Sequence, residues 1–516
     1  MLTAHRALVS VYDKRDLVDF AKGLDRLGIE ILSTGGTFRA LESAGLQVVR
    51  VADLTGYPEI LDGRVKTLHP KIHGGILADR GRASHVAELR DHDIAPIDLV
   101  VANLYPFRET SRKPGVDIAK VVDSIDVGGP CMVRAAAKNY QGVVVVVDPE
   151  DYPQILAALE ETDGLVPEAL RRQLAVKAFR HTQAYDAAIS DWFEHLSESE
   201  DEQFPQHLLL DLAKQSELRY GENPHQGAAL YRVQGDTGVF GGFTQLQGKE
   251  LSYNNLLDAA AALRTVALHT EPAAAIIKHN NPCGVGRGDT AVDAYERALA
   301  CDPVSAFGSA IAVNRPVDVE LAAAIAGRFV ELVLAPDFAA DALPKLAKKS
   351  NLRLLACELE KTRPGDHELR PVPGGFIAQT VDPMEEDESQ WVCPTKRQPT
   401  QAERTALGFA WRVVRAASSN SIVITNEYQS VGIGAGQMSR VDAARFAVTK
   451  AQLETEGCVA ASDGFFPFRD GLDALAEAGV RAIVQPGGSK RDTEVTAAAD
   501  EHGIAMLMTG RRHFRH

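Results

Sequence analysis

The sequence predicts an α/β protein in which a doubly wound parallel sheet comes first and two related α/β subdomains follow in tandem. In the first third, short apolar runs of the β type alternate with helical patterns, which is typical of a parallel sheet covered by helices. In the remainder, one strand-and-helix pattern occurs twice, which is typical of tandem subdomains. A chain of 516 residues is also too long for one core, since domains average roughly 150 residues.

The first third contains five apolar runs that we interpret as strands, and polar residues follow directly after them. Ser10 lies near the end of the first run and Lys14 follows it, and the segment STGGT (33–37) begins at the end of the second. Glycines and the free N–H groups of a starting helix can bind a phosphate, although a tight turn with a threonine cap gives the same pattern. The segment lacks the G-x-G-x-x-G spacing of dinucleotide sites. The predicted strands are residues 7–12, 30–33, 48–51, 99–104 and 143–147, and helical patterns cover 16–27 and 38–44.

Three further polar segments lie in this part of the chain. DGRVKTLHPKIHGG (62–75) is rich in basic side chains and glycines, and we interpret it as an anion-binding loop rather than a solvated charge run. NLYPF (103–107) follows a buried strand. SIDVGGPCMVRAAAKN (124–139) combines an acidic side chain, a Gly-Gly-Pro turn and two basic side chains on one helix face. Each feature alone is weak evidence, but together they predict a pocket for a nucleotide monophosphate.

The charge and the cysteines argue against several classes of function. With 55 basic and 70 acidic residues the net charge is −15, which argues against nucleic-acid and anionic-membrane partners. The first residues lack the apolar core of a secretory signal, and no apolar run approaches the ~18 residues of a membrane span. The six cysteines are scattered without a C-x-x-C pair, so we expect a reduced cytoplasmic protein without a structural zinc site.

A short acidic segment, SESEDEQ (197–203), is interpreted as a linker between an N-terminal domain, residues 1–198, and a C-terminal region, residues 199–516. Within that region, AIIKHNNPCGVGRGDTAVDAYERAL is similar to SIVITNEYQSVGIGAGQMSRVDAARFAV. Corresponding glycines, Gly284 and Gly432, are 148 residues apart. We therefore expect two related subdomains with a boundary near residues 380–400.

The segment AIIKHNNPCGVG begins as an apolar strand and then presents Lys278 and His279 followed by two asparagines. We predict that Pro282 and Gly284 force a turn, after which a helix follows. Ligands of open α/β sheets bind beyond the carboxyl ends of strands. An ammonium, an imidazole and two amides at such an end form an acid–base and oxyanion-binding set. The alternative is a polar strand-to-helix turn with a capping asparagine.

A family resemblance connects these segments along essentially the whole chain. STGGT, GRVKTLHP, NLYPF, IDVGGP with RAAAKN, LRYGENPHQ, KHNNPCG, DPVSAFGS, GIGAGQMSR and SDGFFPFRD occur in the order and at about the spacing of one family. The chain resembles the bifunctional phosphoribosylaminoimidazolecarboxamide (AICAR) formyltransferase / inosinate (IMP) cyclohydrolase family of de novo purine biosynthesis. The resemblance implies a methylglyoxal-synthase-like N-terminal domain, two cytidine-deaminase-like C-terminal subdomains, and a homodimer with its transferase sites between subunits.

The resemblance implies two reactions. A formyl group passes from 10-formyltetrahydrofolate to the 5-amino group of AICAR, and formyl-AICAR then closes to IMP with loss of water. In the transfer, His279 would take the proton of the amine, Lys278 would protonate the leaving folate nitrogen, and Asn420 would hold the formyl oxygen. The other residues carried over to this site are Asp463 near the folate, Phe307, Gly308 and Ser309 around the imidazole, and Arg219, Tyr220 and Arg512 on the nucleotide and its phosphate.

For ring closure, the resemblance implies a carboxylate, two ammonium groups and a phenol, which can move the protons without a metal. No catalytic metal is expected; the family allows a structural alkali cation, for which this sequence shows no recognisable ligand set. Cys131 and Ser418 depart from the family pattern and put only local contacts in doubt. The catalytic residues carried over are Lys66, Tyr105, Asp126 and Lys138, and the phosphate and sugar residues are Ser10, Lys14, Ser33, Thr34, Gly35, Gly36, Arg64 and Thr67.

Two alternatives from other classes stay open at this point. Domains of the N-terminal type also serve as regulatory nucleotide-binding modules; the titratable residues argue for catalysis, and residues 1–198 alone are expected to convert formyl-AICAR to IMP. A zinc deaminase is the second alternative, although its H-x-E…P-C-x-x-C signature is absent, since the PCG turn has no second cysteine. Stoichiometric zinc in a metal analysis would favour it.

Overall fold

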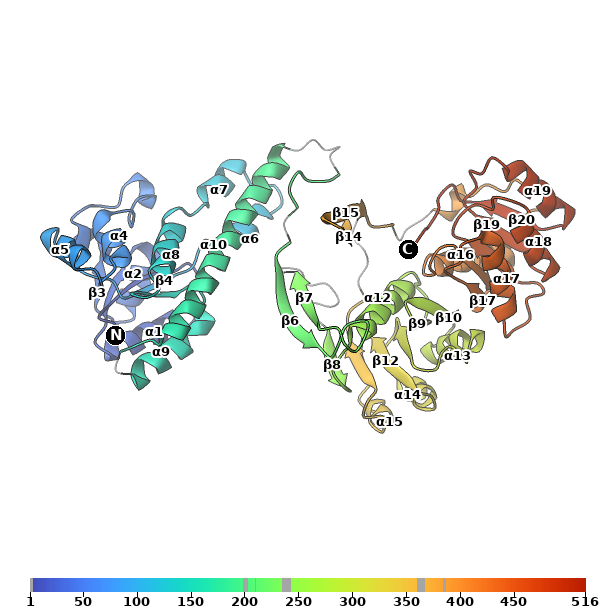
Figure 1. The fold of residues 1–516 in the computed structure, drawn as a ribbon, viewed down its shortest axis with the longest axis horizontal. Coiled ribbons are helices and arrows are strands. Elements are labelled where there is room, and N and C mark those ends of the chain that lie inside the picture. Colours follow the sequence, from blue (N-terminus) through green and yellow to red (C-terminus); the bar gives the residue numbers. More distant parts are fainter. Residues whose placement is uncertain are drawn as a thin grey trace. The chain divides into compact units, whose positions relative to one another are not determined.

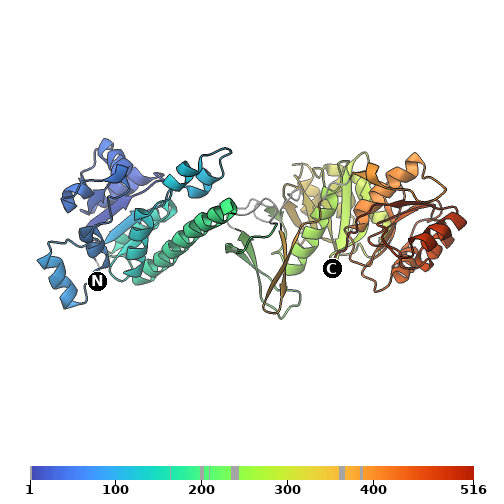
Figure 2. The ribbon, with the colours of Figure 1, turned by 90° about the horizontal axis from the view of Figure 1, so that it is seen from above.

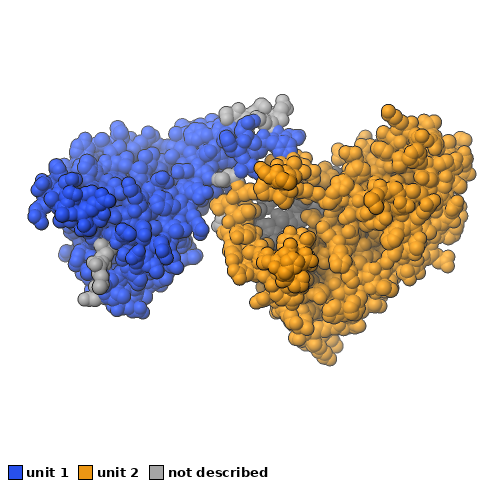
Figure 3. All heavy atoms as spheres, in the orientation of Figure 1, with its two compact units in different colours: residues 1–209 blue, residues 210–516 orange. Residues whose placement is uncertain are grey.

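The structure, a computed structural model, describes residues 3–162, 164–197, 203–208, 210–233, 243–359, 367–383 and 387–516. The chain forms two compact units, Met1–Leu209 (unit 1) and Leu210–His516 (unit 2), which are coloured separately in Figure 3. Most of the expected acidic linker at 197–203 lies outside the described residues. Within the described part of the chain, no helix is both long enough and apolar enough to cross a membrane.

Unit 1 is built on one sheet with the strand order β3-β2-β1-β4-β5, and all of its strand pairs are parallel (Figure 1). The strands are β1 (Arg6–Ser10), β2 (Glu30–Ser33), β3 (Val48–Arg50), β4 (Leu99–Ala102) and β5 (Val144–Val146). The order of the strands reverses between β1 and β4, so right-handed crossovers place helices on both faces. This is the doubly wound parallel sheet predicted from the sequence, and the prediction is confirmed.

The helices of unit 1 cover a sheet whose central strands, β1 and β4, have buried apolar residues. The longest helix, α10, packs along α8 and against β5 (Figure 2). The helices are α1 (Leu17–Arg26), α2 (Gly35–Ser43), α3 (Val51–Thr55), α4 (Pro70–Leu77), α5 (Ala83–Asp91), α6 (Phe107–Ser111), α7 (Ile118–Asp123), α8 (Gly128–Lys138), α9 (Tyr152–Glu161) and α10 (Glu168–Ser197), with short 3-10 turns η1 (Leu61–Gly63) and η2 (Pro149–Asp151).

All five predicted strands of unit 1 are present, and four of them end one or two residues earlier than predicted. Three of these four strands are followed by a buried valine (Val11, Val51 and Val147), which continues the apolar run beyond the last residue of the strand. The helix predicted at 38–44 begins three residues earlier, at Gly35, with Thr34 as its N-cap residue. The glycines of STGGT therefore form the first helical turn rather than a loop before it.

Unit 2 contains two larger sheets, in the orders β10-β9-β11-β12-β13-β8 and β17-β16-β18-β19-β20. In each, an antiparallel hairpin is followed by a helix and then by parallel strands. The chain also forms the two-stranded sheets β6-β7 and β14-β15. The strands are β6 (Leu212–Leu218), β7 (Ala228–Val233), β8 (Thr244–Gln247), β9 (Ala273–Lys278), β10 (Asn281–Arg287), β11 (Ser309–Val313), β12 (Val330–Ala335), β13 (Arg353–Ala356), β14 (His367–Val372), β15 (Gly375–Thr380), β16 (Ile422–Thr425), β17 (Ser430–Gly434), β18 (Val459–Ser462), β19 (Ala482–Gln485) and β20 (Ala505–Met508).

Several helices of unit 2 begin at a side-chain cap. α12, α13 and α16 each start with a reciprocal capping box, at Ser252, Thr290 and Thr400. α12 and α16 share one hydrophobic core with the inner faces of both large sheets, so the two halves of unit 2 are packed together. The helices are α12 (Tyr253–Ala267), α13 (Ala291–Cys301), α14 (Val319–Ala326), α15 (Leu343–Leu346), α16 (Gln401–Val414), α17 (Arg440–Lys450), α18 (Asp470–Glu477) and α19 (Asp492–Glu501), with the 3-10 turn η3 (Glu388–Gln390).

The prediction of a strand, a turn and then a helix for residues 275–286 is wrong in one respect. The structure has a β-hairpin where we expected a strand-to-helix turn. β9 ends at Lys278, a two-residue turn follows, and Pro282 and Gly284 lie inside β10. The glycine allows close packing: a Cβ on Gly284 would lie 1.9 Å from the Ala298 carbonyl oxygen of α13. Likewise, a Cβ on Gly432 of β17 would lie 2.1 Å from the Ala447 carbonyl oxygen of α17. The repeated glycines therefore mark the same strand–helix contact in both halves.

Candidate functional sites

The carboxyl edge of the unit 1 sheet gathers polar groups at the point where the strand order reverses. Ser10 ends β1, and Asn103 follows β4. The Asn103 side chain accepts the N–H groups of Tyr12 and Asp13 at 2.7 and 2.9 Å, which ties the two loops together across the sheet. Open parallel sheets bind ligands at such a reversal point.

The N-terminus of α2 supplies free N–H groups at this edge. Gly35 and Gly36 are its first residues, and the side chain of the N-cap residue Thr34 makes no capping bond in the described structure. The Lys66 ammonium lies 3.6 Å from the position that a Cβ on Gly35 would occupy. Ser33 is buried and donates its hydroxyl to the Val9 carbonyl at 2.7 Å, so it positions the turn. Helix N–H groups and an ammonium together suit a phosphate.

Asp126 lies just before α8 and near Lys66 of this phosphate-binding group. Its carboxylate accepts the Gly129 N–H at 2.9 Å, and its own N–H donates to the Tyr185 hydroxyl at 2.7 Å. Burial raises the pKa of Asp126, and the α8 N–H groups and the Lys66 charge oppose that shift only in part. Thr67 is buried, with its hydroxyl 3.0 Å from the position of a Cβ on Gly128. A carboxyl group with a raised pKa next to an ammonium is suited to proton transfer.

Tyr105 lies on the same edge, and its ring packs edge-on against Tyr12 with the centroids 5.5 Å apart. Three other expected residues lie differently. Lys138 is the last residue of α8, about 15 Å along the helix from its start, so the structure does not bring it to Asp126 within one chain. Arg64 is exposed and paired with the Asp123 carboxylate, and the exposed Lys14 ammonium donates to a backbone carbonyl.

In unit 2, Lys278 and His279 line one pocket of about 200 Å³ at the end of the β9–β10 hairpin. The Lys278 ammonium donates to the Phe307 carbonyl at 2.7 Å. The Phe307 ring is 65% exposed and packs against Phe329, with the centroids 4.9 Å apart. Next to it, Gly308 has a φ of 74°, and Ser309 is buried. The loop expected to surround the imidazole thus lies directly beside the lysine.

The second half of unit 2 reaches the hairpin turn through hydrogen bonds. The Ser418 N–H donates to the Asn281 side chain at 2.8 Å. The Arg515 guanidinium donates to the Asn280 side chain at 2.8 Å, and its backbone N–H donates to the Ser419 hydroxyl at 3.1 Å. The segment that leads to Asn420 is therefore held against the turn that carries Lys278 and His279.

Asn420 is fixed by its neighbours on both ends of its amide. Its side-chain nitrogen donates to the Gln437 carbonyl at 2.9 Å, and its oxygen accepts from Arg440 at 2.7 Å. Arg440 also pairs with Asp463, whose buried carboxylate accepts from the Ser419 hydroxyl as well. In this arrangement Asp463 offers no exposed oxygen to a folate and instead supports Asn420 through Arg440.

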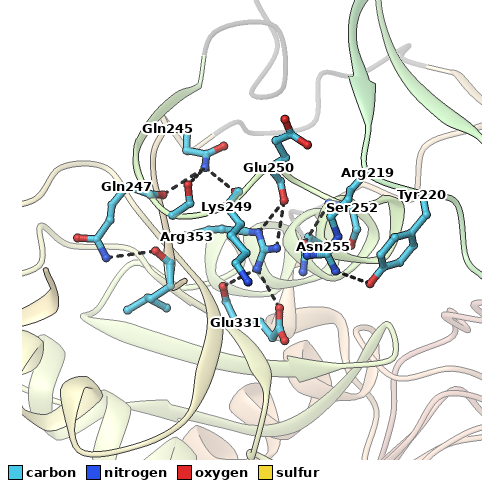
Figure 4. Close-up of polar contacts among 12 residues, drawn as sticks. Arg219, Tyr220, Gln245, Gln247, Lys249, Glu250, Ser252, Asn255, Glu331 and Arg353 are labelled. Carbon is cyan, nitrogen blue, oxygen red and sulfur yellow. Dashed lines mark hydrogen bonds and ion pairs between the residues drawn. The ribbon is translucent and has the colours of Figure 1, made fainter. Parts of the chain in front are cut away.

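Arg219 and Tyr220 lie beside the start of α12 (Figure 4). The guanidinium donates to the Tyr220 hydroxyl at 2.8 Å and lies 4.7 Å from the centre of the tyrosine ring. Arg512 is exposed near the end of the chain, over the Phe514 ring at 4.6 Å. Neither arginine lines the Lys278 pocket.

The pocket also contains charged residues that the motif assignments left out. Asp302 pairs with Lys450 at 2.6 Å and with the Ser305 hydroxyl at 2.6 Å. Asp302 and Ser305 belong to the segment DPVSAFGS, for which the family resemblance implies roles only at Phe307, Gly308 and Ser309. Lys450 ends α17 in the other half and carries no sequence signal. Among the described residues, no three or more His, Cys, Asp or Glu side chains are grouped as metal ligands.

Comparisons with known proteins agree along the whole chain. The family model "AICARFT/IMPCHase bienzyme" matches residues 136–450, and the model "MGS-like domain" matches residues 16–131. The "Bifunctional purine biosynthesis protein PurH" of Acidithiobacillus ferrooxidans is 51% identical over 516 residues, which is 99% of each chain. The protein of that name from Halalkalibacterium halodurans is 50% identical over 512 residues, again 99% of each chain.

One solved structure, titled "Crystal structure of ForH", is 43% identical, covers 37% of this chain and 100% of that chain, and has a TM-score of 0.34. The sequence matches extend over both units and confirm the resemblance inferred from the motifs. The chain therefore belongs to the AICARFT/IMPCHase bienzyme family, the bifunctional formyltransferases and cyclohydrolases of purine biosynthesis.

Proposed function

We propose that this protein makes IMP from AICAR in two steps, with formyl transfer in unit 2 and ring closure in unit 1. Family membership supports both activities and favours catalysis over a regulatory role for the N-terminal domain. One observation supports the transfer site most directly: Lys278 and His279 line the same pocket, with Asn420 held nearby by the second half of unit 2.

The transfer needs a base, an acid and an oxyanion donor. The aromatic amine of AICAR is a poor nucleophile, so it must lose a proton as its nitrogen bonds to the formyl carbon. His279 takes this proton and Lys278 gives one to the leaving folate nitrogen. The Asn420 amide nitrogen donates to the formyl oxygen once its longer bond, to the Met438 carbonyl at 3.4 Å, is released. The formyl donor in this proposal is 10-formyltetrahydrofolate, and Phe307 provides an exposed aromatic face beside Lys278 for a flat ring.

Ring closure uses the group at the carboxyl edge of the unit 1 sheet. The N–H groups of α2 and the Lys66 ammonium bind the phosphate. As the carboxamide nitrogen bonds to the formyl carbon, the Asp126 carboxylate takes a proton from that nitrogen and the Tyr105 hydroxyl gives one to the formyl oxygen. Asp126 then returns its proton to this oxygen, the carbon–oxygen bond breaks and water leaves, while the proton of the formamide nitrogen restores the Tyr105 hydroxyl. The raised pKa of Asp126 supports its role as the base.

A crossed pair of variants of the full chain tests both assignments. His279→Ala is expected to lower formyl transfer by at least about 100-fold and to leave the cyclisation of added formyl-AICAR unchanged. Asp126→Asn is expected to do the opposite. If either variant loses both activities in a folded protein, the assignment of the two sites to separate units is wrong.

We also propose that the protein is a cytoplasmic homodimer. An exposed apolar side chain beside the transfer site supports a partner surface: Met438 is 99% exposed, and its carbonyl accepts from the Asn420 amide at 3.4 Å. Sedimentation equilibrium should give twice the chain mass of 55.7 kDa, and a monomer at micromolar concentration would overturn the proposal.

A further inference from the structure

The turn between β9 and β10 has a backbone conformation that its residues rarely adopt. His279 has a φ of 51° and Asn280 a φ of 65°, in the left-handed region where a Cβ crowds the backbone. Two-residue hairpin turns of this kind favour glycine and asparagine, because these tolerate positive φ. Asn280 fits that preference better than His279 does. The turn that carries the proposed base therefore needs support from outside.

Asp258 on α12 provides that support. Its carboxylate accepts the Asn280 N–H at 2.7 Å, and α12 packs directly on β9 and β11. Burial raises the pKa of Asp258, and this shift is opposed by the Asn280 N–H and then by the charge and N–H of His279 and the charge of Lys278. The carboxylate thus interacts with every residue of the turn.

Asp258 supports the turn from within the first half of unit 2, while the second half supports it from the other side. There, Arg515 holds the Asn280 side chain at 2.8 Å, and the Ser418 N–H bonds to Asn281 at 2.8 Å. Both of these bonds are accepted by the side chains of Asn280 and Asn281, and neither involves the backbone of the turn. Asp258, by contrast, bonds to the backbone of the turn from another element, α12, and it does not itself line the pocket.

We propose that Asp258 is a positioning residue for formyl transfer: its carboxylate holds the backbone of His279 and Asn280 in the left-handed conformation and so places Lys278 and His279 at the pocket. The inference rests on the proposed transferase function of this pocket. Small displacements of reacting groups are sufficient for large losses of rate, because a shift of about 1 Å can lower a rate by roughly 100-fold. The residue would therefore affect kcat more than substrate binding.

Three variants of the full chain test the proposal. Asp258→Ala removes the acceptor and is expected to lower kcat for formyl transfer by at least about 30-fold, with the KM for AICAR within roughly 3-fold. Asp258→Asn keeps an oxygen that can accept the Asn280 N–H and is expected to retain kcat within roughly 5-fold. Asp318→Ala is the matched control, because its carboxylate accepts the Leu321 N–H at 2.8 Å at the start of α14. It should lower the melting temperature without lowering kcat.

Cyclisation of added formyl-AICAR, measured on the same samples, shows that unit 1 remains intact. Asp258→Ser replaces the alanine variant if that protein does not fold, with the same expected loss. The proposal is overturned if the alanine variant keeps kcat within about 3-fold, or if the asparagine variant is as impaired as the alanine variant. If wild-type protein shows no formyl transfer while cyclising formyl-AICAR, the proposed transferase function fails instead.

Discussion

His269 is buried where little can stabilise a positive charge, so we expect acid to destabilise unit 2 partly through this one residue. Its ring packs against Phe409, with the centroids 5.4 Å apart, and neither ring nitrogen has a hydrogen-bond partner in the described part of the chain. Burial, assisted by the charge of Arg412, lowers the pKa of His269 from 6.5 to about 3. The imidazole is therefore neutral in the folded protein at all physiological pH values.

The size of the effect follows from linkage. The unfolded chain binds the proton with a pKa near 6.5, whereas the folded chain does so only near pH 3. Because the pKa of His269 is lower in the folded state, the contribution of this residue to the free energy of unfolding is fully present above pH 6.5. That contribution is lost as the pH falls toward 3. The loss is about 1.4 kcal/mol per pH unit within this window. At pH 5 it amounts to about 2 kcal/mol, and at pH 7.5 it is close to zero.

The assay compares His269→Leu with its parent in urea unfolding at pH 7.5 and pH 5.0. A Trp192→Phe background leaves Trp391 and Trp411 as reporters, both in unit 2. The leucine variant lacks the titrating group, so its free energy of unfolding relative to the parent should be about 2 kcal/mol higher at pH 5.0 than at pH 7.5.

His225→Leu is the matched control, because His225 is exposed. Its effect relative to the parent should be the same at both pH values. If the His269 variant also shows the same difference from the parent at both pH values, within about 0.5 kcal/mol, then the buried imidazole is protonated without penalty and the reasoning is refuted.

Three other predictions concern the packing of unit 2. Gly284→Ala places a methyl group against a carbonyl of α13 and should lower the stability of unit 2 by about 1–3 kcal/mol, measured by urea unfolding; an unchanged midpoint would contradict the packing explanation of the repeated glycines. Arg440→Met leaves the buried Asp463 carboxylate unpaired and should lower stability by about 3–5 kcal/mol. Arg353→Met, which removes the ion pair with Glu331 (Figure 4), should lower it less, by about 1–2 kcal/mol. The reason is that the Glu331 side chain is 40% exposed. Equal losses in the two arginine variants would show that burial of the partner does not decide the effect.

Much of unit 1 could be predicted from residue type. Strands of a parallel sheet are buried on both faces, so they appear as continuous apolar runs such as the one that became β5. The strand ends were less predictable, because an apolar residue after the last ladder bond still packs on the core. Val147 is such a residue, since it is buried outside β5.

The hairpin at Lys278 shows where local pattern is insufficient. Pro282 and Gly284 are common in turns, and a proline within a strand normally argues against that strand. Here β10 tolerates Pro282 with a shift in register between these two residues, and Gly284 is needed for contact with α13. A nearest-neighbour pattern cannot distinguish a glycine that turns the chain from one that lets a helix approach.

Motif order along the chain was sufficient to identify the family, the two activities and the main polar segments, since each motif is a local property of a few residues. The groups that meet in the transfer pocket depend on packing. Lys450 reaches Asp302, and Ser418 reaches Asn281, because α12, α16 and both sheets share one core that brings together residues well over a hundred positions apart. Asp258 depends on the same packing, since only the contact of α12 with β9 places its carboxylate at the turn. Contacts between distant segments follow from how apolar faces are buried together, and no single segment encodes them.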